Sequence, residues 1–97
     1  MYIGSCRLTF YLRDNDSLKG KRNVSRSLIT RLQQKFNFAV AEIDGIDHHQ
    51  RLVIGMACVS KDANHASEMI DNALDYVESR SIDAELVRVA RDVLPEG

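Results

Sequence analysis

Residues 6–13 read Cys6-Arg7-Leu8-Thr9-Phe10-Tyr11-Leu12-Arg13, and every even-numbered position is apolar. Successive side chains of a β-strand point to opposite faces, so this alternation predicts a half-buried strand over residues 2–12. A strand with one apolar face needs neighbouring strands and a single covering layer to bury that face. The stretch therefore predicts a sheet that is covered on one side.

The residues that follow predict the other elements in turn. Loop chemistry at 14–16 ends the strand, and Ser17 is a good N-cap for a helix whose apolar spacing runs to Phe36. Short apolar runs predict strands over 38–43 and 52–59, joined by a turn at 44–47. Helical spacing predicts a second helix from residue 63 to about 77, and a last strand is expected over 85–93, before Pro95.

The predicted order is β-α-β-β-α-β. With right-handed crossovers it gives a four-stranded antiparallel sheet with both helices on one face, the ferredoxin-like arrangement of the α+β class. A chain of 97 residues is enough for one such domain over residues 1–97.

Composition excludes several classes of protein. With 44% hydrophobic and 28% charged residues, the chain is neither collagen-like, nor disordered, nor a disulfide scaffold. Cys6 and Cys58 lie far apart in apolar stretches, which favours reduced, buried thiols in a cytoplasmic protein. No apolar run approaches the ~18 residues of a membrane span, and we expect no signal peptide and no membrane contact.

The net charge of −1 conceals an uneven distribution. Residues 1–35 hold eight basic and two acidic residues, whereas residues 36–97 hold five basic and twelve acidic ones. This asymmetry is typical of a chain with one face for an anionic partner. The alternative is that the two halves attract each other across the fold.

The start of the first helix, Ser17-Leu18-Lys19-Gly20-Lys21-Arg22, is unusually basic. Helix N-termini carry partial positive charge and favour acidic residues, yet here cations crowd the end and Gly20 stands where a capping-box Glu is expected. Backbone N–H groups, dipole and cations together favour a bound phosphate. We therefore predict a phosphate or RNA site at Ser17, Lys19, Lys21, Arg22 and Arg26. The alternative is a solvated helix face balanced by Asp14 and Asp16.

This interpretation has two consequences for stability. Glutamate at position 20 should stabilise the protein by about 1 kcal/mol, through helix propensity and a restored capping box. Alanine at Lys21 or Arg22 should leave stability unchanged or slightly higher, because each removes a cation from a disfavoured place.

Two further features are weaker. Arg7, Tyr11 and Arg13 share the outward side of the first strand and are candidates for stacking on RNA bases, although a solvated strand or a dimer interface also accounts for them. The predicted strand over 52–59 has apolar side chains on both of its faces. An antiparallel sheet with one face in water is expected to be polar on that face. A second copy of the chain is the simplest cover, so we expect a homodimer.

No residues form a catalytic constellation. A Gly-rich phosphate loop, a Ser/His/Asp set and an HExxH motif are all absent from the sequence, and residues 13–16 lack the loop of acylphosphatases. His48 and His49 are adjacent and would point to opposite faces, so a polar loop is favoured over a metal site. We expect no catalysis, no metal and no cofactor.

Several short motifs in combination resemble those of the YlxP-like family of small bacterial proteins. They are Ile3-Gly4-x-Cys6-Arg7, Ser17-Leu18-Lys19-x-Lys21-Arg22, Phe36-Asn37, Ala41-Glu42-Ile43-Asp44, Gln50-Arg51 and Gly55-x-Ala57-x-Val59-Ser60. Gly20 departs from the family, which commonly has Glu there, and His48-His49 replaces a pair that is often apolar and aromatic.

The resemblance implies a ferredoxin-like fold and a bacterial cytoplasmic protein without an established activity. Members are often encoded beside translation and ribosome-maturation factors, which implies a connection with RNA or the ribosome. We therefore predict a non-enzymatic RNA- or ribosome-associated protein. The alternative is a dimeric protein-interaction or regulatory module without nucleic-acid contact.

Overall fold

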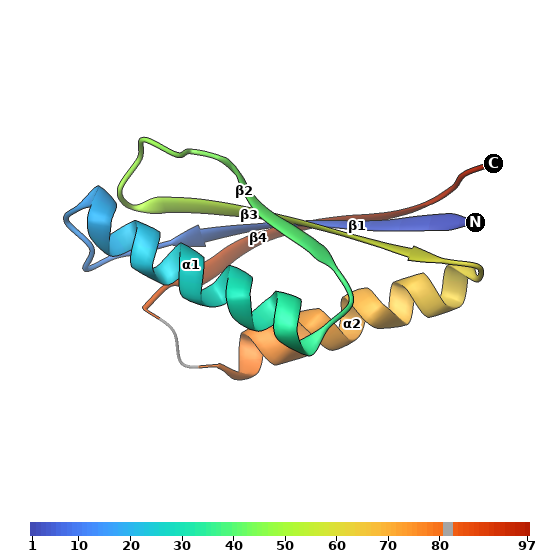
Figure 1. Ribbon diagram of the computed structural model, residues 1–97. Helices are drawn as coiled ribbons and strands as arrows, with labels where there is room; N and C mark the ends of the chain where they lie inside the picture. Colours follow the sequence, from blue (N-terminus) through green and yellow to red (C-terminus); the bar gives the residue numbers. More distant parts are fainter. Residues whose placement is uncertain (81–82) are drawn as a thin grey trace.

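The computed structural model describes residues 1–80 and 83–97, and its elements follow the predicted order (Figure 1). They are β1 (Tyr2–Tyr11), α1 (Leu18–Lys35), β2 (Ala39–Asp44), β3 (Arg51–Ser60), α2 (Ala63–Ser79) and β4 (Glu85–Pro95). All strand pairs are antiparallel, in the order β2-β3-β1-β4. Both helices lie on the same side of this sheet in Figure 1, so the ferredoxin-like α+β prediction is confirmed. None of the described helices is long and apolar enough to cross a membrane.

The core lies between the sheet and the two helices. The alternation in β1 buries Cys6, Leu8 and Phe10 on the helix side, as predicted. Each fully buried Leu or Phe stabilises the fold by about 1.5–3 kcal/mol. Cys6 and Cys58 are free and buried, and burial raises the pKa of both thiols. The other buried core side chains come chiefly from β3 and the helices: Leu52, Ile54, Met56, Leu28, Leu32, Ala66, Ile70 and Ala73.

The start of α1 is capped differently from the prediction. The Ser17 Oγ accepts a hydrogen bond from the Gly20 N–H at 3.0 Å, as an N-cap should. The Asn15 side chain lies over Gly20 and donates to the backbone oxygens of Ser17, at 2.8 Å, and His49. A Cβ atom on Gly20 would overlap the Asn15 Oδ1, so the space for a capping-box glutamate is already occupied. The structure therefore argues against the expectation that glutamate stabilises this position.

Lys21 is buried, with 1% of its side chain exposed. Its Nζ donates to the backbone oxygens of Gly45, Ile46 and Arg51 at 2.6, 3.0 and 3.3 Å. Glu42 Oε2 lies 3.0 Å from the same nitrogen, as an ion pair rather than a fourth hydrogen bond, since three protons are already in use. The ammonium thus ties the first turn of α1 to the loop between β2 and β3.

This position corrects one part of the predicted phosphate site. Lys21 lies on the same helix face as the buried Ser25, Leu28 and Leu32, because they follow it at helical spacing. Its charge is fully engaged inside the chain and is not available to an external phosphate. Lys21 instead pairs with Glu42, a residue of the acidic second part of the chain, as the alternative interpretation expected.

Replacing Gly20 tests the contact with Asn15. We expect Gly20→Ala and Gly20→Glu to lower the melting temperature, because the new side chain displaces Asn15 and breaks its two hydrogen bonds. In an Asn15→Ala background, Gly20→Ala should instead stabilise the protein, by up to about 1 kcal/mol of helix propensity. A melting temperature that rises for Gly20→Glu in the wild-type background would contradict this account.

Replacing Lys21 tests the buried ion pair. Lys21→Met leaves the Glu42 carboxylate and three loop carbonyls without their partner, so it should lower the free energy of unfolding by about 3 kcal/mol in urea denaturation. Lys21→Met combined with Glu42→Leu should lose less than the two single variants together, because no charge is then left unpaired. Unchanged stability of Lys21→Met would show that the ammonium does not hold the loop.

Candidate nucleic-acid interface

The outer face of α1 is strongly basic. The helix sequence holds six basic residues and no acidic one, and five of the six are exposed. These five are Lys19, Arg22, Arg26, Arg31 and Lys35; we call the surface of the first four the α1 basic face, because Lys35 lies over the Tyr76 ring of α2. They face solvent because the inward side of the helix is taken by Lys21 and the apolar stripe.

The cations of the α1 basic face are not used in ion pairs within the described residues. The ion pairs there involve other cations: Arg7, Arg13, Lys21, Arg51 and Arg91. Asp14 and Asp16, which could have balanced the helix start, make no ion pair with it in residues 1–80 and 83–97. The first turn of α1 contains no acidic residue. The positive end of the helix and its outward cations therefore form no ion pair in the described chain.

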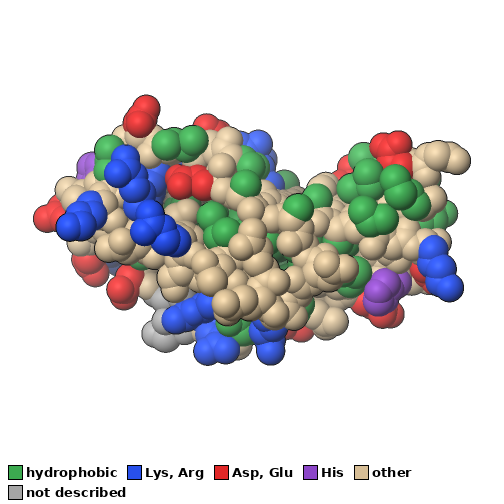
Figure 2. All heavy atoms as spheres, viewed as in Figure 1, with side chains coloured by type: hydrophobic (Ala, Val, Ile, Leu, Met, Phe, Trp, Pro, Cys, Tyr) green, Lys and Arg blue, Asp and Glu red, His purple; other side chains and the backbone are tan. Residues whose placement is uncertain are grey.

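Uncharged hydrogen-bonding side chains lie between the cations. Arg26 and Arg31 border a shallow hollow of about 410 Å³ on the outer face of α1. Figure 2 shows basic side chains gathered over the end of α1 at the left of the view. The other residues of the hollow are Asn23, Ser27, Thr30 and Gln34, all of which can donate hydrogen bonds.

The predicted site residues thus fall into separate groups. Lys19, Arg22 and Arg26 share the α1 basic face, and Ser17 caps the same helix through its hydroxyl oxygen. Sequence reasoning missed Arg31 and Lys35, although the lack of any acidic residue over 18–35 is readable in the sequence.

Arg7 lies apart from α1, on the uncovered face of the sheet. Its Nη2 is 3.0 Å from Asp44 Oδ2, which Arg51 also approaches at 3.4 Å. The Gly45 backbone N–H, and then the two arginines, lower the pKa of the Asp44 carboxyl. Arg7 is therefore already paired, and it is separate from the α1 basic face.

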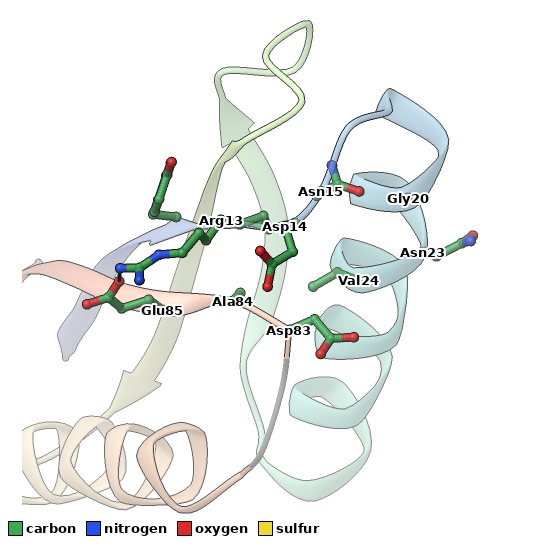
Figure 3. Close-up of a pocket in the computed structure, with 11 residues that line it drawn as sticks. Arg13, Asp14, Asn15, Gly20, Asn23, Val24, Asp83, Ala84 and Glu85 are labelled. Carbon is green, nitrogen blue, oxygen red and sulfur yellow. Dashed lines mark ion pairs between the residues drawn. The ribbon is translucent and has the colours of Figure 1, made fainter.

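Tyr11 and Arg13 line a cleft of about 770 Å³ beside the first half of α1 (Figure 3). The Arg13 Nη2 lies 3.6 Å from Glu85 Oε2 at the start of β4. Leu12, Val24 and Ala84 supply apolar walls. The polar lining is mostly acidic or amide: Asp14, Asn15, Asn23, Asp83 and Glu85.

The aromatic residues near the far end of α1 are already in contact with other groups. The Tyr76 ring of α2 lies 5.5 Å from Phe36, edge to face, and Arg80 lies over it at 4.6 Å. Lys35 approaches the same ring at 5.3 Å. Tyr76 also lines a hollow of about 280 Å³ beside α1, but its ring is already in contact with Phe36, Arg80 and Lys35.

The loop between β2 and β3 is polar, as expected for His48 and His49. Their rings stack with centroids 6.0 Å apart, so the expectation that they point to opposite faces was wrong, because the two residues lie in a turn and not in an extended strand. His48 Nδ1 accepts a hydrogen bond from the Gln50 N–H at 3.2 Å. In the part of the chain that the structure describes, no three His, Cys, Asp or Glu side chains lie close enough to hold a metal ion.

The sheet face opposite the helices is uncovered and carries small residues at its centre. Residues that lie opposite each other on neighbouring strands point to the same face of the sheet. By this register, the small residues on the uncovered face are Ala39, Ala41, Gly55, Ala57 and Ala90. Ile43 packs over Gly55, where a Cβ atom would meet its side chain at 2.9 Å. Val59 and Leu94 flank Ile3 at one end of this face, and they are 62% and 50% exposed, respectively.

Two comparisons place the chain among known sequences. A family model described as a protein of unknown function (DUF503) matches residues 3–91. An uncharacterized protein YlxP of Bacillus subtilis (strain 168) is 34% identical over 77 residues, which cover 79% of this chain and 84% of that protein. The family resemblance of the sequence is thereby confirmed: the chain belongs to the DUF503 family and is similar to YlxP.

Proposed function

We propose that this protein is a non-enzymatic, cytoplasmic RNA-binding protein, which binds the sugar–phosphate backbone through the α1 basic face. The observation that carries the proposal is a helix with five exposed cations, no acidic residue and no internal ion pair on that face in the described chain. Two free, buried thiols support the location. Ribosomal RNA is one RNA of the required chemistry.

The energetics of α1 favour an external partner. Arg22 and Arg26 are four residues apart, as are Arg31 and Lys35, and each such like-charge pair destabilises a helix by about 0.2–0.5 kcal/mol. Lys19, in the first turn, adds about 0.3–1 kcal/mol against the helix dipole. Lys35 has favourable partners in the C-terminal end of the helix dipole and the Tyr76 ring, but no ion pair in the described chain offsets the repulsion around Lys19, Arg22 and Arg26. Phosphate groups along the face would offset it.

The length of the face suits several phosphates. From Lys19 to Arg31 the helix rises by about 18 Å, at 1.5 Å per residue. A stacked strand advances by about 3.4 Å per nucleotide, so roughly five phosphates span that distance. Backbone contacts of this kind position a nucleic acid without reading its sequence.

Salt dependence measures these contacts directly. The logarithm of the affinity for a single-stranded RNA should fall linearly with the logarithm of the salt concentration, and Arg22→Ala and Arg26→Ala should each reduce the slope by about 0.7. Thermal melting of both variants should be unchanged or slightly higher. Arg88→Ala is the matched control, because Arg88 is an exposed cation on the uncovered sheet face. RNA binding that depends equally on Arg88, or that shows no salt dependence, would contradict the proposal.

A second proposal concerns assembly: the uncovered sheet face forms a homodimer. It rests on the small residues at the centre of that face and on the exposed Ile43, Val59 and Leu94 around them. Arg7, Arg51 and Asp44 bring both signs of charge to the same face, which a two-fold related copy can complement. If this surface were the whole function, the protein would be an interaction module without RNA contact.

Light scattering tests the homodimer. At micromolar concentration we expect about twice the monomer mass of 11.0 kDa. Ala57→Glu, which adds a charge to the centre of the uncovered face, should give the monomer mass, whereas Asn64→Glu on α2 should not. A wild-type protein that stays at 11.0 kDa throughout this range would rule the homodimer out.

A further inference from the structure

The cleft beside α1 and the α1 basic face meet along one edge but carry opposite charge. Asn23 lines both the cleft and the shallow hollow on the outer face of the helix. Lys19 and Arg26 lie four residues before and three residues after Asn23, so all three are neighbours on the helix surface. A positively charged surface thus borders directly on a cleft whose charged lining is mainly acidic.

Of the three described carboxylates that line this cleft, Asp14 is the one between the apolar walls, whereas Asp83 lies on the border with a second hollow beside α1. Figure 3 shows the Asp14 side chain pointing from the loop after β1 into the space between Ala84 and Val24. Glu85, another carboxylate of the lining, is paired with Arg13 across the opening. Among residues 1–80 and 83–97, no cation forms an ion pair with Asp14.

The juxtaposition of charges restricts what can enter. A free cation or polyamine would be attracted by Asp14 but repelled by the adjoining cations of α1. A simple anion would be attracted by these cations but repelled by Asp14. A nucleotide satisfies both surfaces, because its phosphate is anionic and its base presents N–H donors. The cleft volume of about 770 Å³ lies within the 300–1,000 Å³ of typical small-molecule sites, and its apolar walls suit a flat ring.

We propose that this cleft binds one unpaired nucleobase of the RNA held on the α1 basic face, and that Asp14 selects guanine. The inference rests on the proposed function and adds a specificity site to it. Among the four bases, only guanine presents two parallel donors, N1–H and N2–H, to the two oxygens of one carboxylate. Cytosine and adenine place an acceptor beside their amino group, and uracil flanks its single N–H with two carbonyls, so each turns an acceptor toward Asp14.

Fluorescence anisotropy with labelled RNA octamers tests the proposal. The octamers are octauridine and versions in which one central position carries guanine, inosine or no base. We expect the guanine octamer to bind roughly tenfold more tightly than octauridine, the range of one good bidentate contact. Inosine lacks the N2 amino group and should lose most of that preference, and the abasic octamer should bind like octauridine or more weakly.

Two variants separate base selection from simple charge. Asp14→Asn should abolish the preference for guanine and leave the salt dependence of octauridine binding unchanged. Asp16→Asn removes the same charge from the same loop, at a residue outside the cleft lining, and should keep the preference. Because both variants raise the general affinity for RNA alike, the ratio of guanine to uridine affinity isolates the role of Asp14.

The outcomes distinguish the two proposals. Equal affinity of the wild-type protein for all four octamers, with normal salt dependence, would reject the base site and leave the phosphate contacts standing. A guanine preference that persists in Asp14→Asn would also reject it. Absence of salt-dependent binding to every octamer would reject the proposed function itself, and the base site with it.

Discussion

The buried ammonium of Lys21 determines how α1 is set on the sheet. Removing a charge from water costs several kcal/mol, and here three loop carbonyls and the Glu42 carboxylate offset that cost. With position 21 fixed inward, the 3.6-residue turn of the helix directs Lys19, Arg22 and Arg26 outward. Lys21, which the sequence places in the basic cluster, is thus the residue that orients the other cations.

The same end of the molecule is held together by a second set of contacts. The Leu12 N–H donates to the Gln50 oxygen at 2.9 Å, and the Gln50 amide donates to the Arg13 oxygen at 3.1 Å. Asn15 adds its bonds to Ser17 and His49. The loop after β1 is therefore tied to the loop between β2 and β3, and this fixes the segment from which Asp14 reaches into the cleft.

Much of the fold was predictable because it depends on local patterns. Alternation in β1 and helical spacing in α1 and α2 gave the elements to within one or two residues. The burial of Lys21 could not be predicted, because it depends on carbonyls 24 to 30 residues away that converge only in the folded chain. The role of Gly20 could not be predicted either, because it depends on the folded position of Asn15. The missing side chain of Gly20 makes room for Asn15 and does not indicate a poorly capped helix.

The candidate site was predictable in part for the same reason. Helical periodicity was enough to bring Lys19, Arg22 and Arg26 to one flank of α1, and the run without acidic residues could have added Arg31. The cleft needed the tertiary structure, since it joins residues 11–15, 20–24 and 83–85. Alternation along β1 correctly predicted that Arg7 points away from the core. It could not predict that Arg7 forms an ion pair with Asp44 on that face.

The central claim is that the outward cations of α1 bind RNA phosphates while Lys21 only orients them. Nuclear magnetic resonance of the side-chain N–H groups of arginine and lysine tests this claim most directly, in a titration of the protein with RNA at low and high salt. We expect the signals of Arg22, Arg26 and Arg31 to shift at low salt and return at high salt, while those of Lys21 and Arg88 stay in place. Shifts confined to Arg7 and Arg88 on the uncovered sheet face, or a shift of Lys21 equal to that of Arg22, would contradict the account.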